Sequence, residues 1–249
     1  MSKKSKLEIG SGNLISIKPI TDNQKIVFET WKQKKNQFLF GCAGTGKTFI
    51  SLYLALQDVM NLQTKYDKVV LVRSLIPTRE IGFLPGDEED KAALYQVPYA
   101  NMVQFMFQQP NEQAFNMLYD KLKQQGSLYF LSTSFLRGLT FDNSIIIVDE
   151  CQNLNFHELD SIITRVGENS RIMFCGDVVQ TDLVKQHEKN GIIDFMKILE
   201  NMKEFTSIEF GVLKSSTFQI QSISRMLALQ IMIEALSSQL TKITLMSQY

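Results

Sequence analysis

Short apolar runs alternate with longer amphipathic segments through most of the chain. The runs at 68–73 and 144–149 are rich in β-branched residues, which is typical of strands buried on both faces. Apolar runs of this kind predict strands at 37–40, 68–73, 128–131, 144–149 and 171–175. Helices are expected at 21–35, 49–60, 98–125 and 156–166. Strands that alternate with helices form parallel βαβ units, so the pattern predicts an α/β fold with a doubly wound, mostly parallel sheet flanked by helices.

The two ends of the chain depart from this pattern. Residues 1–20 are polar and are interpreted as a mobile arm or a short hairpin. In residues 211–249 the apolar positions follow a 3-4-3-4-3 spacing that predicts an amphipathic helix, either packed on the domain or forming an oligomer seam. These positions are Met226, Leu229, Ile233, Leu236, Leu240 and Ile243. We therefore expect one domain at 21–210, preceded by an arm and followed by an atypical helical tail.

Composition and charge add few constraints. The formal net charge of the 249 residues is zero, so overall charge predicts attraction neither to nucleic acid nor to a membrane. Lysines outnumber acids before residue 40, either as a contact surface for a phosphate backbone or as a solvated face. The cysteines have neither disulfide nor metal-ligand spacing. Without an apolar run of membrane-spanning length or a signal peptide, we expect a cytoplasmic protein with no membrane partner.

A phosphate-binding loop follows the first expected strand. The sequence at 41–48 fits the pattern G-x-x-x-x-G-K-[ST] and lies between an apolar run and a helix-like run. Glycines let the backbone curl, so that several N–H groups can cradle a polyphosphate. Lys47 supplies positive charge to the β and γ phosphates, and the Thr48 hydroxyl can ligate Mg²⁺. The expected nucleotide-binding residues are Gly41, Cys42, Ala43, Gly44, Thr45, Gly46, Lys47 and Thr48.

Two adjacent acids end the expected strand at 144–149. Asp149 and Glu150 should project into the crevice at the carboxyl edge of the sheet, where ligands of open α/β sheets bind. Asp149 can hold the water shell of Mg²⁺, and Glu150 can act as general base toward an attacking water. The second acid favours a hydrolase over a kinase that uses an acceptor substrate. The alternative is a strand that simply ends in a solvated turn.

A third strand end carries polar residues after 171–175. Gln180 closes the segment Gly176-Asp177-Val178-Val179-Gln180, and its amide can sense the γ-phosphate or orient the water. The expected catalytic residues are therefore Lys47, Glu150 and Gln180. The proline- and glycine-containing segment 76–90 is interpreted as a structured loop, either functional or a decorative insertion.

Taken in order, these motifs resemble the PhoH family of bacteria and tailed phages. The segments specific to that family are Gly82-Phe83-Leu84-Pro85-Gly86-Asp87 and Phe135-Leu136-Arg137-Gly138. The phosphate-binding loop, Asp149-Glu150-Cys151-Gln152-Asn153 and the segment ending at Gln180 are shared with helicases generally. The resemblance covers roughly residues 20–210. It implies a single RecA-like domain, related to superfamily 1 helicase motors, that binds and hydrolyses ATP with Mg²⁺, in the host cytoplasm if a phage encodes it.

The resemblance also bears on the adenine base and on the chain end. Gln24 is similar to the adenine-reading glutamine of related helicases, although a surface glutamine on a helix is the open alternative. After Phe210 the chain lacks the Asp-x-Val-Arg-like stretch with which PhoH proteins usually continue. A shifted reading frame near residue 211 is one hypothesis for this loss, and resequencing the gene would test it.

A single RecA-like domain is half of a helicase motor. Related helicases place ATP between two such domains, and the second donates an arginine. Here a neighbouring subunit would donate it, which implies a homo-oligomer, or turnover is slow. The candidate arginines are Arg73, Arg79, Arg137 and Arg165.

Two classes of function remain open at this stage. One is an ATP-driven enzyme that acts on single-stranded nucleic acid, with a mild preference for RNA over DNA, as the helicase-like motifs and early lysines suggest. The other is an ATP-dependent switch or assembly protein whose partner is a protein. An ATPase assay with and without nucleic acid separates the two.

Overall fold

The computed structural model of the protein describes residues 13–74, 88–136, 138–177 and 186–211. Side chains are not described for 88–94 and 186–190. Several expected features lie outside these residues. They are residues 1–12 of the arm, the family segment 82–87, the tail from residue 212 onward, and the side chains of Arg79, Arg137 and Gln180.

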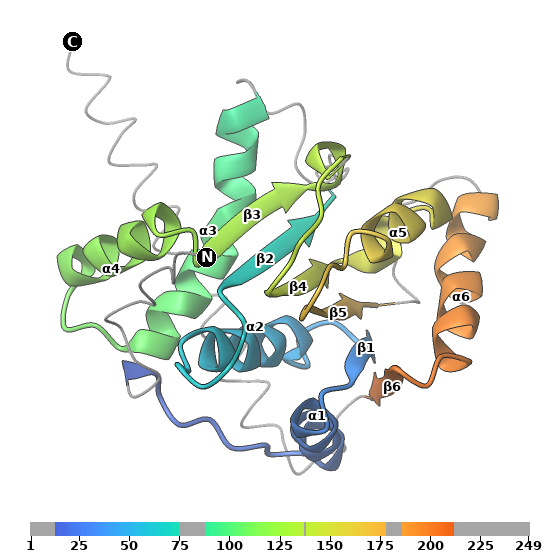
Figure 1. The fold of residues 1–249 in the computed structure, drawn as a ribbon, viewed down its shortest axis with the longest axis horizontal. Coiled ribbons are helices and arrows are strands. Elements are labelled where there is room, and N and C mark those ends of the chain that lie inside the picture. Colours follow the sequence, from blue (N-terminus) through green and yellow to red (C-terminus); the bar gives the residue numbers. More distant parts are fainter. Residues whose placement is uncertain (1–12, 75–87, 137, 178–185, 212–249) are drawn as a thin grey trace.

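A single parallel sheet organises the described residues (Figure 1). Its order is β3-β2-β4-β5-β1-β6, and each pair of neighbours runs parallel. The strands are β1 (Asn36–Gly41), β2 (Lys68–Arg73), β3 (Leu128–Ser132), β4 (Ser144–Asp149), β5 (Arg171–Gly176) and β6 (Phe205–Phe210). The strand that carries the acids is thus separated from the strand that carries the phosphate-binding loop by β5, which is the arrangement of a RecA-like P-loop domain.

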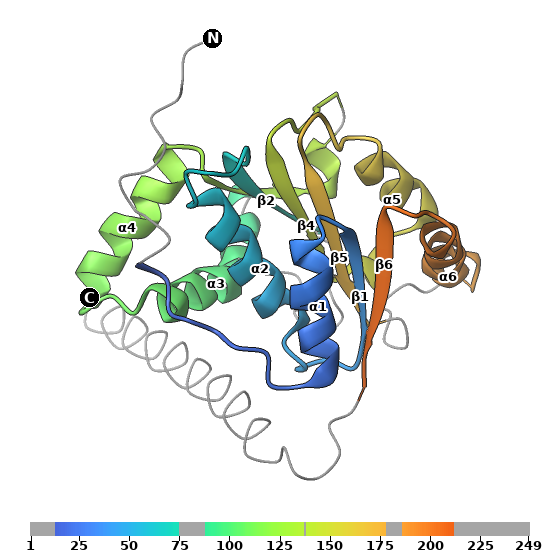
Figure 2. The ribbon, with the colours of Figure 1, turned by 60° about the horizontal axis from the view of Figure 1, so that its bottom comes forward.

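Helices cover both faces of the sheet (Figure 2). They are α1 (Asp22–Lys32), α2 (Lys47–Val59), α3 (Glu88–Phe107), α4 (Glu112–Gln124), α5 (Phe156–Ile163) and α6 (Gln186–Glu200). Val69 and Leu71 belong to the core under α1 to α4, whereas Val70 and Val72 belong to the core under α5 and α6. Successive side chains of a strand point to opposite faces, and each face here meets apolar helix residues. This two-sided burial accounts for the nearly unbroken apolar runs.

The expected strands are confirmed, with small shifts at their ends, but two elements were not predicted. Strand β6 contains Thr206, Ser207 and Glu209 because it lies at the edge of the sheet, so its sequence lacks a continuous apolar run. Helix α6 begins in a polar stretch, and the sequence reasoning did not assign it.

The single helix expected at 98–125 is wrong, because two helices occupy this region. Gln108 ends the first with a left-handed backbone, φ +43°. Asn111 then caps α4, its side chain accepting a hydrogen bond from the Ala114 amide at 2.8 Å. Residues 88–90, expected in the loop at 76–90, belong instead to α3, which begins at Glu88; the rest of the expected loop lies outside the described residues.

The described part of the N-terminal arm lies on the domain. The Ile15 amide donates to the Met106 carbonyl at 2.9 Å, and the Ile17 amide donates to Tyr53 Oη at 3.2 Å. Leu14 and Ile17 pack against the core beneath α2 and α3. Residues 13–20 therefore contribute to the same core as the helices that follow.

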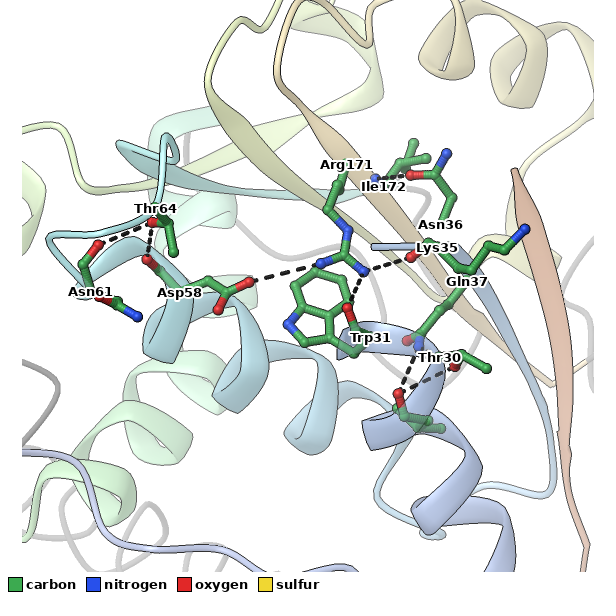
Figure 3. Close-up of polar contacts among 11 residues, drawn as sticks. Thr30, Trp31, Lys35, Asn36, Gln37, Asp58, Asn61, Thr64, Arg171 and Ile172 are labelled. Carbon is green, nitrogen blue, oxygen red and sulfur yellow. Dashed lines mark hydrogen bonds and ion pairs between the residues drawn. The ribbon is translucent and has the colours of Figure 1, made fainter. Parts of the chain in front are cut away.

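Arg171 joins three elements at the amino edge of the sheet (Figure 3). Its guanidinium Nη2 donates to the Trp31 carbonyl at 3.0 Å and to the Lys35 carbonyl at 2.6 Å, at the end of α1. The guanidinium also lies over the Trp31 ring, 3.3 Å from the centroid, and its Nη1 is 3.8 Å from Asp58 Oδ2.

The ion pair between Arg171 and Asp58 does not by itself offset the burial of the two groups. Burial raises the pKa of Asp58 in spite of the nearby guanidinium, and burial lowers the pKa of Arg171 in spite of Asp58 and Tyr66. For both partners, therefore, the cost of leaving water exceeds their mutual attraction. The carbonyls at the end of α1 carry partial negative charge, which favours a cation at this point.

Replacing Arg171 by methionine should destabilise the domain. The substitution keeps most of the volume but removes the cation shared by the Trp31 and Lys35 carbonyls and Asp58, although the Trp31 carbonyl still accepts from the Lys34 amide. We expect this loss to cost about 3 kcal/mol of unfolding free energy. Urea denaturation measures the change. Lys197, which forms an exposed pair with Asp194 on α6, is the matched control. Its replacement by methionine should change stability by no more than about 0.5 kcal/mol, and a similar small change for Arg171 would contradict the assignment.

Candidate nucleotide-binding and hydrolysis site

The phosphate-binding loop and the two predicted acids lie at the carboxyl edge of the sheet, where β1, β5 and β4 end. The loop at 41–48 follows β1 and opens α2, and Asp149 and Glu150 follow β4. Ligands of open α/β sheets bind at this edge.

The loop backbone takes the shape that the glycines permit. Gly41, Gly44 and Gly46 have φ values of +124°, +73° and +87°. At Gly41 a side chain would also collide with the Phe210 carbonyl of β6, which accepts a hydrogen bond from the Cys42 amide at 3.2 Å. Gly46 precedes α2 without a side-chain cap, so the first amides of this helix remain available to an anion.

Internal groups of the protein occupy parts of this cradle. Lys47 Nζ donates to the carbonyls of Gly41 at 2.8 Å and Cys42 at 2.7 Å. The Ala43 amide donates to Asp177 Oδ2 at 3.1 Å. A carboxylate is an anion, so its contact with a loop amide indicates that the loop suits negatively charged oxygen. The residues therefore fit a phosphate chemically.

Thr48 and Asp149 are joined directly. The Thr48 hydroxyl donates to Asp149 Oδ1 at 2.7 Å across 101 residues of sequence. A hydroxyl and a carboxylate oxygen are hard ligands of the type Mg²⁺ takes, and Mg²⁺ usually binds one or two carboxylates together with substrate phosphates. This pair of donors therefore fits a metal that is shared with a phosphate. Within the described residues there is no group of three or more His, Cys, Asp or Glu that could hold a metal.

Glu150 is held beside Asp149 in an unusual backbone conformation. Its φ of +52° and ψ of +40° are left-handed, which costs about 1–2 kcal/mol for a residue with a side chain. Burial and the charge of Asp149 raise the pKa of Glu150. Gln152 Nε2 donates to Glu150 Oε2 at 2.5 Å. The carboxylate is therefore partly desolvated and oriented, as a general base requires.

Gln152 also ties this turn to the end of β5. Its Oε1 accepts a hydrogen bond from the Asp177 amide at 3.0 Å. The turn η3 (Cys151–Asn153) approaches so closely that a side chain at Gly176 would lie 2.6 Å from Cys151 Sγ. Glycine at 176 thus allows the two strand ends to touch.

Gln24 lies at the start of α1 and caps it. Its side-chain Oε1 accepts hydrogen bonds from the backbone N–H groups of Ile20 at 2.8 Å and Thr21 at 3.4 Å. In return, the backbone N–H of Gln24 donates to Thr21 Oγ1. A cavity of about 410 Å³ lies next to it, between α1 and β6. It is lined by Asn23, Ile26, Ser207, Ile208, Glu209 and Gly211. Asn23 lines the cavity, but Gln24, the expected adenine reader, is not among its lining residues and is engaged in a capping box.

The two candidate arginines that the structure describes, Arg73 and Arg165, lie at opposite edges of the sheet. Arg73 ends β2 directly opposite Asp149 in the strand register, and its pKa is raised by nearby Tyr99, Asp149 and Glu150 against the effect of burial. Arg165 lies at the opposite edge of the sheet, where its carbonyl accepts from the Phe141 amide just before β4. Lys32 ends α1, and Lys34 and Lys35 lie between α1 and β1, before the amino end of β1, whereas the phosphate-binding loop follows its carboxyl end.

Three residues of the site had no role in the sequence reasoning. Gln152 and Asp177 were part of the motifs, and their polarity beside strand ends was the available signal. Tyr99 had no such signal, because its contact with Asp149 spans 50 residues and depends on where α3 packs.

Comparison with known proteins agrees with the motif assignment. The family model "PhoH-like protein" matches residues 16–222. Protein PhoH2 of Bacillus subtilis is 35% identical over 145 residues, which are 58% of this chain and 32% of PhoH2. A PhoH-like protein of Synechocystis is 32% identical over 67% of this chain and 48% of its own length. Protein PhoH of Escherichia coli is 30% identical over 72% and 49%. The chain thus spans a third to a half of the length of these relatives.

Solved structures give weaker likenesses. The large terminase of a thermophilic bacteriophage, in complex with ADP, has a TM-score of 0.43 at 12% identity over 77% of this chain and 45% of its own. A Bacteroides Pif1 helicase with ADP-AlF3 and single-stranded DNA has a TM-score of 0.34 at 17% identity over 79% and 43%. Scores at this level carry no argument about function.

None of the helices in the described ranges combines the length and the apolar character needed to cross a membrane.

The loop, the paired acids and the matched family model point to one group of proteins. The chain belongs to the PhoH-like protein family.

Proposed function

We propose that the chain binds ATP with Mg²⁺ at this edge of the sheet and hydrolyses it. The observation that carries the proposal is the Thr48–Asp149 hydrogen bond with the desolvated Glu150 beside it. Lys47 would exchange its contacts with the loop carbonyls for contacts with phosphate oxygens. Thr48 and Asp149 would hold the metal, which neutralises charge on the β and γ phosphates. Glu150 would accept the proton of the attacking water.

Two further residues belong to the proposal on sequence grounds. Gln180, outside the described residues, would sense the γ-phosphate. Gln24 would read adenine, with the base placed toward the cavity between α1 and β6 that its neighbour Asn23 lines. To do so its side chain would have to release the amides that it caps.

Replacing Glu150 by glutamine should leave nucleotide binding intact and abolish turnover. The amide keeps the shape but cannot accept the proton, so we expect a loss of about 10²- to 10⁴-fold in the rate of ATP hydrolysis. Phosphate release measures turnover, and fluorescent ADP titration measures binding. Glu200, exposed on α6, gives the control substitution, which should change neither. A Glu150→Gln variant that still hydrolyses at the normal rate would refute the assignment of the base.

We further propose that hydrolysis is coupled to single-stranded nucleic acid, with RNA preferred over DNA. The helicase-like motifs support this coupling. The aromatic ring of Phe135 offers a place for a base, because it follows β3 at the carboxyl edge and is 59% exposed. Bases stack on such rings without regard to sequence.

Single-stranded RNA should therefore stimulate hydrolysis, and Phe135→Ala should weaken the response. Loss of one stacked base corresponds to about 1–3 kcal/mol, so we expect a roughly 5- to 150-fold higher RNA concentration at half-maximal stimulation. Leu62 is 69% exposed before β2, at the opposite edge of the sheet, and Leu62→Ala is the control. If hydrolysis by the unsubstituted protein ignores both RNA and single-stranded DNA, the protein-partner switch replaces this proposal.

We also propose that the chain works as a homo-oligomer. Arg165 could act only on a neighbour's site, since it lies at the far edge of its own sheet, and an arginine supplied in trans is worth about 10³- to 10⁵-fold in rate. Specific activity should then rise with protein concentration, together with the mass measured by light scattering in ATP. A monomer that hydrolyses ATP at constant specific activity would favour Arg73, within the same chain, instead.

A further inference from the structure

Tyr99 makes a buried contact with the acid assigned to the metal. Its side chain is 2% exposed, and Tyr99 Oη donates to Asp149 Oδ2 at 2.7 Å. Thr48 donates to the other oxygen, Oδ1, at the same distance. The two carboxylate oxygens are thus distinguished: one faces the phosphate-binding loop, and the other faces α3.

Arg73 fixes the direction of this contact. Arg73 Nη1 lies 3.5 Å from Tyr99 Oη, and its guanidinium lies 5.4 Å from the centre of the Tyr95 ring. Because Tyr99 Oη is engaged by a permanent cation, its own hydrogen is left to point at Asp149. The result is an ordered chain from β2 through α3 to the end of β4.

We propose that Tyr99 is a positioning residue that holds Asp149 Oδ2, so that Oδ1 stays aligned with Thr48 for the metal. The inference rests on the proposed ATP site and adds a residue to it. Without the hydroxyl, Oδ2 would lose a buried donor, and the carboxylate could rotate away from Thr48. Partners that orient metal ligands are typically worth roughly 10- to 100-fold in metal affinity or activity.

A purely packing role for Tyr99 makes a different prediction. The ring lies 5.6 Å from that of Phe130, as a core aromatic would. If packing of the ring were its whole contribution, removing only the hydroxyl would leave metal binding unchanged. Tyr99→Phe separates the two roles, because the ring stays in place.

The matched control is Tyr53→Phe. Tyr53 is 3% exposed on α2, and its hydroxyl accepts a hydrogen bond from the Ile17 amide, away from the acids. Both substitutions remove one buried hydroxyl. Only the one at Tyr99 should affect the metal.

Binding of Mn²⁺ in the presence of ADP, followed by electron paramagnetic resonance, tests the inference without requiring turnover, since Mn²⁺ takes the same oxygen ligands as Mg²⁺. We expect Tyr99→Phe to weaken Mn²⁺ binding by about 10-fold or more, with ADP binding in the absence of metal unchanged. Tyr53→Phe should bind Mn²⁺ like the unsubstituted protein. Urea denaturation of the unsubstituted protein and of both variants checks that all three are folded under the conditions of the binding experiment.

The outcomes separate this inference from the proposed function. Equal Mn²⁺ affinity for Tyr99→Phe and the unsubstituted protein would overturn the positioning role, whether or not ATP is hydrolysed. A weakened Mn²⁺ affinity in a protein that does not hydrolyse ATP would uphold the positioning role and reject the hydrolase. An unsubstituted protein that binds no Mn²⁺ with ADP would overturn both.

Discussion

The position of β5 between β1 and β4 is the constraint on which the rest of the site depends. Parallel strands bring their carboxyl ends to one edge, and one intervening strand leaves a gap of roughly 10 Å between the phosphate-binding loop and the acids. Thr48, in the first turn of α2, spans that gap to reach Asp149. Gly176, at the end of β5, lets the turn after Glu150 come close. The loop and the acids therefore form one site only because the order of strands allows them to meet.

The two edges of the sheet are held by different chemistry. At the amino edge Arg171, a permanent cation, binds backbone carbonyls and the face of an indole ring, and no group there needs to move. At the carboxyl edge the contacts come mainly from hydroxyls, an amide and a lysine, which can exchange partners at small cost. A fixed edge and an adaptable edge suit a domain that must change its contacts when a nucleotide binds while its core stays in place.

Most of the sheet could be predicted from the sequence because its inner strands are buried on both faces and read as apolar runs. The edge strand β6 was not predicted, because the solvent-exposed Glu209 interrupts its run of apolar residues. The loop and the acids were also predictable, since each is adjacent to its strand in sequence. The contacts of Asp149 with Tyr99 and of Ala43 with Asp177 span 50 and 134 residues. Such contacts depend on packing, to which local sequence patterns are blind.

The contacts of Lys47 and Asp177 with the loop carry a consequence for affinity. The protein holds its own cation against loop carbonyls and its own carboxylate against a loop amide, so an incoming phosphate meets an internal competitor. The affinity measured for the proposed nucleotide would then be a net quantity, equal to the intrinsic affinity multiplied by the fraction of molecules in which these contacts are open. Binding of a nucleotide at this loop would thus be an exchange of one set of ionic partners for another.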